Sequence, residues 1–382
     1  MAGILFYGSL AVLMMGIACL VDSRSLCGKY VCRTGEQMPR RQLLSLTAIF
    51  ILFLIMTAVA ALRIDVGNDY GNYVLTFHEI FVGGYVVTEP GFNWLVRLIY
   101  TLCGNENYLV VFALFAAVTA FLFLKAMADQ SVDFTMSFAL FMLFGLYFRT
   151  FNTVRYYFVL AVTLYSIRYV LKREFVKFIM LIILAALFHK SVLVVIPLYL
   201  IALLPWKKWM VVLGGAAALS LPLFQEFWIQ VLLKLYPSYQ NTVYLQKDVG
   251  MEGSLMGIIR CAAVLILALA AWKECVREHP VNLFYWKLNL LALAMYSCAS
   301  FVPLVSRLGY YLITPHILLI PGILTNLPPG RKKKLLTLAV LGFAALYFAY
   351  FLLTAHQVGG RVLPYHTWIT YEKEWLDGSL IF

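Results

Sequence analysis

Residues 43–62 read LLSLTAIFILFLIMTAVAAL, a continuous apolar run without a charged side chain. A helix needs about twenty mainly apolar residues to cross the hydrocarbon core of a bilayer, so this run predicts a membrane-spanning helix. The character of the chain then changes, because residues 63–77 read RIDVGNDYGNYVLTF and place Arg63, Asp65 and Asp69 together at the end of the helix. The change predicts a polar site where the helix leaves the membrane.

The whole chain shares the apolar character of residues 43–62. Of its 382 residues, 63% are hydrophobic and only 13% are charged, whereas about a quarter of the residues of a soluble globular protein are charged. Inside lipid the backbone must satisfy its own hydrogen bonds, which leaves helices or closed barrels. The apolar runs are continuous and do not alternate with polar residues, which predicts an all-α, polytopic integral membrane protein.

Eleven further apolar runs bring the expected number of spans to about twelve. These further candidates are residues 4–21, 107–127, 134–148, 153–171, 176–188, 191–204, 208–224, 254–272, 286–304, 309–326 and 333–354. The net charge of +12 comes from short basic clusters between the runs, as in loop 22–42 and at 331–334. If loop 22–42 is cytoplasmic, alternation places every strong basic cluster inside and both termini outside, as the positive-inside rule requires. This distribution argues against a nucleic-acid partner.

The same alternation defines an outer face within one membrane-embedded domain, residues 1–382. On that face we expect a motif loop at 63–106, a second loop at 225–253 and a C-terminal tail at 355–382. Segment 88–103, TEPGFNWLVRLIYTLC, mixes polar and apolar positions and begins near Pro90, which predicts an interfacial helix. The seven scattered cysteines show no zinc-site spacing, so no metal site is expected.

Further polar clusters interrupt the apolar runs on this outer side. FRTFNTVRYY, residues 148–157, contains Arg149, Asn152 and Arg155 between two apolar segments. An arginine at membrane depth costs at least roughly 2.5–3.5 kcal/mol, so it usually faces a cavity or a partner. The alternative is a structural role, in which these arginines pair with Asp65, Asp69 or Glu89.

Two more clusters lie further along the chain. His189 interrupts LAALFHKSVLVVIP, residues 184–197, and its imidazole suits either phosphate orientation and proton relay or a purely structural contact. FVPLVSRLGYYLITPHI, residues 301–317, carries Arg307 followed by Tyr310 and Tyr311.

Arginines from separate helices that meet in one cavity would form an anion site. The candidates Arg63, Arg155 and Arg307 come from three distant parts of the chain. One charge pair at about 4 Å and an effective dielectric near 20 is worth roughly 4 kcal/mol before desolvation. Two or three such groups would hold a pyrophosphate and stabilise its charge as it leaves.

Six motifs follow one another along the chain: RIDVGNDYGNY (63–73), EPGFNWL (89–95), NTVR (152–155), ALFHKS (186–191), RLGYY (307–311) and LPYHTW (363–368). This ordered set resembles the EpsG family of Wzy-like exopolysaccharide polymerases. Family members usually carry a small hydroxyl residue where Asn68 stands, which leaves a role for that side chain open. The resemblance implies a GT-C-like membrane glycosyltransferase that joins polyprenyl-pyrophosphate-linked oligosaccharides on the outer face of a bacterial cytoplasmic membrane.

The resemblance also implies partners and the roles of individual residues. No cofactor or metal is expected, and the partners would be the lipid-linked oligosaccharide, membrane lipid, a flippase and a chain-length regulator. Arg155 and Arg307 would bind pyrophosphate with support from Arg63, and Asp69 or Asp65 would serve as the base or orient the acceptor. The other expected contacts with substrate come from Tyr73, Glu89, Arg149, Asn152, His189, Tyr310, Tyr311 and Tyr365.

Three other functions remain open from the sequence. A transporter for lipid-linked glycan would show repeated halves with a site at mid-membrane, and no repeat is evident here. A non-catalytic scaffold of an envelope complex would tolerate alanine at the arginines. A ligase that moves the glycan onto another carrier differs only in its acceptor.

Overall fold

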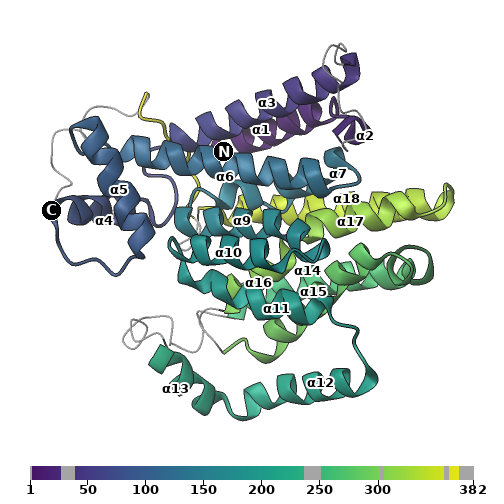
Figure 1. The fold of residues 1–382 in the computed structure, drawn as a ribbon. Coiled ribbons are helices and arrows are strands. Elements are labelled where there is room, and N and C mark those ends of the chain that lie inside the picture. Colours follow the sequence, from purple (N-terminus) through teal and green to yellow (C-terminus); the bar gives the residue numbers. More distant parts are fainter. Residues whose placement is uncertain (1, 27–38, 236–250, 302–304, 357–360, 370–382) are drawn as a thin grey trace. The chain divides into compact units, whose positions relative to one another are not determined.

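The computed structural model describes residues 2–26, 39–235, 251–301, 305–356 and 361–369 (Figure 1). Within these ranges the regular elements are helices, and one isolated antiparallel bridge joins Arg63 to Thr367. The expectation of an all-α chain is therefore confirmed for the part of the chain that is described. Parts of two predicted outer segments, residues 236–250 and 370–382, lie outside it.

The chain divides into two compact units. The first comprises Met1–Ser166, Met180–Lys190 and Gly330–Phe382, and the second comprises Ile167–Ile179 and Ser191–Pro329. Two helices, α9 (Val154–Leu171) and α10 (Phe175–Ala186), contribute residues to both units. The expectation of one membrane-embedded domain stays a prediction.

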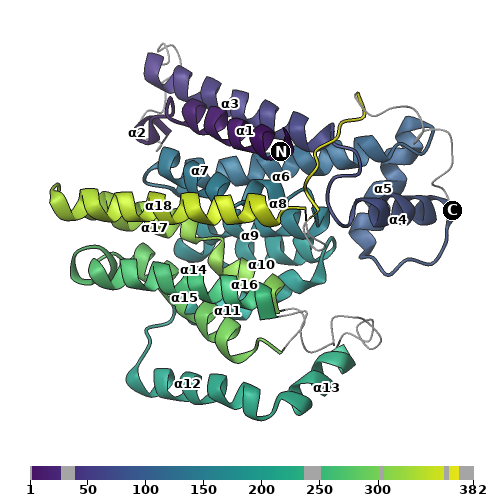
Figure 2. The ribbon, with the colours of Figure 1, turned by 180° about the vertical axis from the view of Figure 1, so that it is seen from behind.

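The first unit is built from long apolar helices and a pair of shorter amphipathic ones. Besides its parts of α9 and α10, its helices are α1 (Ala2–Ala18), α2 (Ser23–Leu26), α3 (Arg40–Ala61), α4 (Tyr70–Val82), α5 (Pro90–Cys103), α6 (Tyr108–Gln130), α7 (Phe134–Leu143), α8 (Leu146–Arg149) and α18 (Arg331–Thr354). Helix α3 packs along α6, while α1 contacts both α3 and α7 (Figures 1 and 2). Gly145 adopts a left-handed conformation between α7 and α8, which divides the helix expected at 134–148.

Helices α4 and α5 form a small aromatic core that the rest of the candidate site is built on. The buried side chains of α4 recur at helical spacing, at Tyr70, Tyr73, Phe77 and Ile80, and they pack against rings of α5 and α6. Pro90 occupies the first turn of α5, where its missing N–H costs nothing. The helix predicted within 88–103 is thus confirmed, whereas α4 was not expected inside the motif loop 63–106.

The second unit contains shorter helices and several breaks. Besides its parts of α9 and α10, it holds η1 (Lys190–Val194) apart from Lys190, α11 (Val195–Leu203), α12 (Lys208–Leu223), α13 (Gln225–Leu235), α14 (Met251–Ala270), a π-helical turn η4 (Trp272–Arg277), α15 (Pro280–Cys298), α16 (Val305–Ile313) and α17 (His316–Asn326). Helix α13 occupies the first part of the loop expected at 225–253, and α12 meets it at an angle of 90°.

Five helical segments of the described residues are long and apolar enough to cross a membrane. They are Arg40–Ala61, Tyr108–Gln130, Val154–Leu171, Arg307–Asn326 and Arg331–Thr354. The bent pair formed by α12 and the start of α13 would be a sixth if it counts as one span. These helices fit the expected multi-pass membrane protein, while a count of twelve spans stays a prediction. Five shorter apolar helices of 10–17 residues account for much of the difference.

Candidate functional site

The motif that follows α3 is held in place by the far end of the chain. The Ile64 N–H donates to the His366 carbonyl at 3.0 Å, and the Trp368 N–H donates to the Leu62 carbonyl at 3.2 Å. Figure 2 shows this C-terminal segment, in yellow, passing the start of α1 toward the end of α3. We call residues 361–368 the tail segment. Its Tyr365 was expected at the site from the sequence, whereas its backbone pairing with residues 62–64 was not.

Asp65 is one of the residues that the tail segment engages. Its carboxylate forms an ion pair with the Arg361 guanidinium, and its φ of 50° lies in the left-handed region. The Gly67 N–H donates to the Arg361 carbonyl at 2.8 Å. Asp65 therefore anchors the tail segment to the motif.

Gly67 is the point at which the motif touches the turn before α9. Its φ is 103°, and a Cβ atom placed there would overlap the carbonyl oxygen of Phe151.

We expect Gly67→Ala to lower the free energy of unfolding by about 1–3 kcal/mol, because alanine is strained at this φ and its Cβ atom would meet the Phe151 carbonyl. Unfolding of the purified variant in mixed detergent micelles measures the change. Gly71→Ala is the matched control, since its Cβ would meet no atom within 4 Å, and an equal loss in both variants would contradict the explanation.

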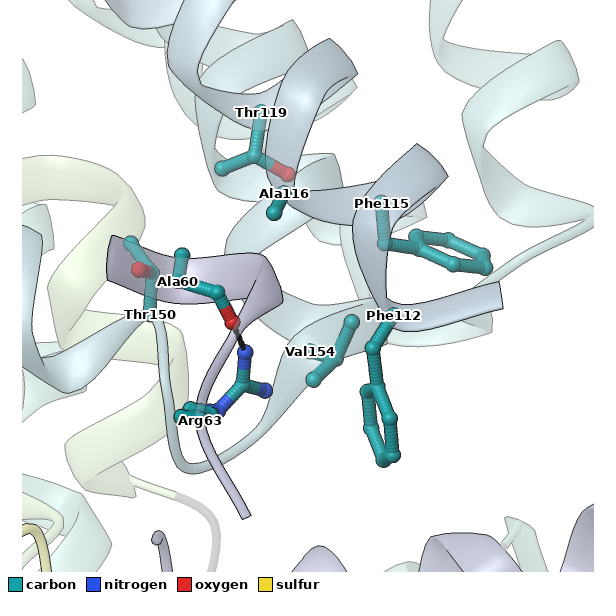
Figure 3. Close-up of a pocket in the computed structure, with 8 residues that line it drawn as sticks. All are labelled: Ala60, Arg63, Phe112, Phe115, Ala116, Thr119, Thr150 and Val154. Atoms are coloured by element: carbon teal, nitrogen blue, oxygen red, sulfur yellow. Dashed lines mark hydrogen bonds between the residues drawn. The ribbon is translucent and has the colours of Figure 1, made fainter. Parts of the chain in front are cut away.

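Arg63 lies in the interior of the first unit and is only 2% exposed. Figure 3 shows its guanidinium pointing back to the Ala60 carbonyl, in a small cavity that Phe112 also lines. It also donates to the Phe151 carbonyl at 3.3 Å and lies 5.0 Å from the ring centroid of Phe112. Burial lowers the pKa of Arg63 from its ordinary value, because desolvation disfavours the cation. These contacts make Arg63 a brace between the end of α3 and the turn before α9.

Tyr365 of the tail segment contacts the same end of α3. Its hydroxyl donates to the Val59 carbonyl at 2.9 Å, and its ring stacks on Phe6 with centroids 4.7 Å apart. Burial raises the pKa of Tyr365 to about 12, so the hydroxyl keeps its proton at neutral pH. The structure thus gives Tyr365 a packing role, and its expected contact with glycan stays a prediction.

Asp69 connects the start of α4 to the turn before α9. Its N–H donates to the Asn152 side-chain oxygen at 3.2 Å, and the Thr153 hydroxyl donates to its carboxylate at 3.2 Å. Two carboxylates of the motif therefore differ in their partners, because Asp65 pairs with a cation and Asp69 accepts from a neutral hydroxyl. Among the described residues, the hydrogen-bond partners of the Asp69 side chain and N–H are neutral groups.

Arg155 stands at the first turn of α9 and is held on several sides. Its guanidinium pairs with the Glu89 carboxylate, and the two side chains are 18% and 14% exposed. It also lies 4.9 Å from the ring centroid of Phe92 and 5.9 Å from that of Tyr73. The second oxygen of Glu89 accepts the Lys190 N–H at 3.1 Å. Of the acids considered from the sequence, Glu89 is the one that pairs with Arg155.

A cleft of about 490 Å³ opens beside Arg155, a size typical of ligand-binding pockets. We call it the α4 cleft; its lining residues are Asn72, Leu75, Thr76, Glu79, Tyr85, Val86, Val87, Thr88 and Arg155. Most of these residues were not singled out from the sequence. The signal was present in YGNYVLTFHE, where Asn72, Thr76 and Glu79 recur at the spacing of one helical face.

The other expected site residues of the first unit lie in different surroundings. The His189 ring lies 5.7 Å from the ring of Tyr156, just after the end of α10. The Arg149 guanidinium lies 5.2 Å from the ring centroid of Phe351 on α18. Both side chains therefore contact aromatic rings, and their expected roles toward substrate stay predictions.

Arg307, Tyr310 and Tyr311 belong to the second unit, on α16. The Tyr311 side chain is fully buried, and its hydroxyl shares a hydrogen bond of 2.9 Å with the Ser191 hydroxyl. The Tyr199 hydroxyl donates to the Tyr311 carbonyl at 2.9 Å. Arg307 is half-buried on the same helix, and its convergence with Arg155 stays a prediction.

The motifs that contain Arg155, Asp65 and Asp69 occur along the chain in the order found in one protein family. A family model described as the EpsG family matches residues 46–367, most of the chain. The chain belongs to the EpsG family. The match covers every motif quoted above apart from Trp368 at its end. No curated protein and no solved structure matches the chain. Membership in the EpsG family implies a Wzy-like polymerase or a related function in membrane glycan chemistry.

Proposed function

We propose that this EpsG-family protein polymerises lipid-linked oligosaccharide repeat units. The donor is a glycan on polyprenyl pyrophosphate, and the acceptor is a sugar hydroxyl of a second lipid-linked chain. The observation that carries the proposal is Arg155, a braced cation whose side chain reaches a cleft of ligand size. A positioned guanidinium beside a cleft is suited to a phosphate group.

At the anomeric carbon one bond forms and one breaks, and the acceptor hydroxyl loses its proton to a base. The acceptor hydroxyl oxygen attacks the anomeric carbon of the donor, and the bond from that carbon to the pyrophosphate oxygen breaks. The bonding electron pair leaves with the pyrophosphate, and Arg155 neutralises part of the charge that develops there. Arg307 is proposed as the second pyrophosphate ligand, with Arg63 bracing the turn that precedes α9.

Asp69 is proposed as the base that receives the acceptor proton. The carboxylate of Asp65 is already paired with Arg361, whereas that of Asp69 accepts only the Thr153 hydroxyl among the contacts described. Both Asp69 and Arg155 approach Tyr73. The Tyr73 hydroxyl accepts the backbone N–H of Arg155 at 3.4 Å, and while burial raises the pKa of Tyr73, Arg155 lowers it and Asp69 raises it. Base and cation therefore approach one aromatic residue.

The remaining elements of the proposal concern setting and partners. The reaction is placed at the outer face of a bacterial cytoplasmic membrane, in a single GT-C-like domain of about twelve spans with both termini outside. Arginines take the place of a divalent metal, and a flippase and a chain-length regulator act with the protein. His189 would contact phosphate or acceptor. Arg149, Asn152, Tyr310, Tyr311 and Tyr365 are proposed to shape the substrate site.

Incubation of the purified protein with a defined polyprenyl-pyrophosphate oligosaccharide tests the function directly. We expect a ladder of products that differ by whole repeat units, together with released polyprenyl pyrophosphate. Detergent solution holds no second compartment, so a transporter would leave the substrate unchanged. The absence of any longer product under conditions in which the folded protein binds the substrate would reject the polymerase.

A further inference from the structure

We propose that the α4 cleft binds the sugar residues next to the pyrophosphate of the donor. This inference rests on the proposed function, because it extends the same site outward from Arg155. It assigns a glycan subsite to residues of α4 and of segment 84–88 that the sequence motifs left without a role.

Helix α4 has two faces with different chemistry. Tyr73, Phe77 and Ile80 are buried in the aromatic core. The cleft takes an adjacent face, where Asn72, Thr76 and Glu79 follow one another at intervals of four and three residues, together with Leu75. A helix that covers a core with one face therefore lines a ligand-sized space with polar groups on the other.

The lining combines polar groups with the apolar side chains of Leu75, Val86 and Val87, a mixture that suits the hydroxyls and C–H faces of a sugar. Sugar hydroxyls donate and accept hydrogen bonds, which suits the Asn72 amide and the Glu79 carboxylate. The ring of Tyr85 is 90% exposed and offers an apolar surface to the C–H face of a pyranose. A polyprenyl chain would supply no hydrogen-bond partner to these polar groups and would remove them from water at a cost.

Arg155 fixes the direction of the bound substrate. It is the cation that lines the α4 cleft, so a pyrophosphate held by Arg155 places the attached sugars along α4. The cleft volume of about 490 Å³ falls within the 300–1,000 Å³ or so that is usual for small-molecule sites.

Gly84 provides a precise way to disturb the cleft. A Cβ atom at Gly84 would overlap the side-chain carboxylate of Glu79, and Gly84 needs no left-handed backbone conformation. Alanine at this position therefore displaces one flexible carboxylate and leaves the backbone unchanged. Gly71→Ala is the matched control, because a Cβ atom there meets nothing within 4 Å.

Binding of two probes by the full-length protein in detergent tests the inference. The first probe is the polyprenyl-pyrophosphate oligosaccharide used for the product ladder, and the second is the same polyprenyl pyrophosphate without sugar. We expect Tyr85→Ala and Gly84→Ala each to weaken binding of the first probe about tenfold, the effect of one lost contact. Binding of the second probe should match wild type in both variants, which also shows that they are folded.

Two results would overturn the glycan subsite. Equal weakening of both probes would mean that the cleft holds the lipid or the pyrophosphate, and unchanged binding of the first probe would mean that it holds no part of the substrate. A failure of the proposed function gives a different result. If the two variants show the expected binding pattern but wild-type protein produces no ladder, the glycan subsite stands and the polymerase activity is rejected.

Discussion

Arg155→Ala should lower the rate of chain extension by about 100- to 1,000-fold, the usual loss when one electrostatic donor to a developing negative charge is removed. The guanidinium is fixed before substrate arrives, because Glu89 pairs with it and the Phe92 ring lies 4.9 Å from it. A preorganised cation loses little energy to reorganisation during the reaction. The rate of ladder formation from a defined lipid-linked oligosaccharide measures the effect.

Loss of the Arg155 side chain also leaves the Glu89 carboxylate without its cation in a mostly buried position, which can destabilise the fold. Arg155→Lys is therefore the companion variant, since it keeps the charge and loses the planar fork that matches phosphate. We expect Arg155→Lys to fold and to show an activity between that of wild type and that of Arg155→Ala. Polymers of wild-type length from a folded Arg155→Ala protein would remove the pyrophosphate role.

Long apolar runs made much of the fold predictable from sequence. Residues 43–62 correspond to α3 (Arg40–Ala61) and residues 107–127 to α6 (Tyr108–Gln130), because length and apolarity alone specify a helix that satisfies its own hydrogen bonds in lipid. Short breaks were harder to see. Gly145 interrupts a uniformly apolar segment, and only its left-handed backbone separates α7 from α8.

The amphipathic helix α4 was not predicted, for a physical reason. Helix α4 buries Tyr73 and Phe77 on one side and carries Asn72 and Thr76 on the other, and its 13 residues are too few to form an apolar run that crosses a membrane. Its neighbour α5 was predictable because Pro90 marks a first helical turn. Recognition of α4 required the period of the pattern in addition to its composition.

The candidate site was predictable in its residues and only partly in its pairings. Pairing of Arg155 with Asp65, Asp69 or Glu89 was the alternative to pyrophosphate binding, and in the structure Glu89 is its partner, with the Phe92 ring beside the same guanidinium. The pairing of Asp65 with Arg361 joins residues 296 positions apart. One sequence contains no signal for such a contact, because it depends on where the tail segment runs after α18.

The different partners of the two aspartates lead to opposite expectations for their variants. Asp69→Asn should lower kcat for chain extension by about 100-fold or more, the typical contribution of a positioned base, with little change in KM. The amide keeps the size of the side chain and remains able to accept the Thr153 hydroxyl, so the fold should persist. Asp65→Asn removes the charge opposite Arg361 and should mainly loosen the tail segment.

Kinetics and protection of the tail segment together separate these roles. Steady-state extension assays give kcat and KM for each variant, and limited proteolysis followed by mass spectrometry reports cleavage within residues 361–368. We expect Asp69→Asn to show wild-type protection with a low kcat, and Asp65→Asn to show faster cleavage with a smaller loss of kcat. A low kcat with wild-type protection in Asp65→Asn, and faster cleavage in Asp69→Asn, would instead identify Asp65 as the base. In the structure Asp65 holds the tail segment through Arg361, so accepting the acceptor proton would require it to release that segment.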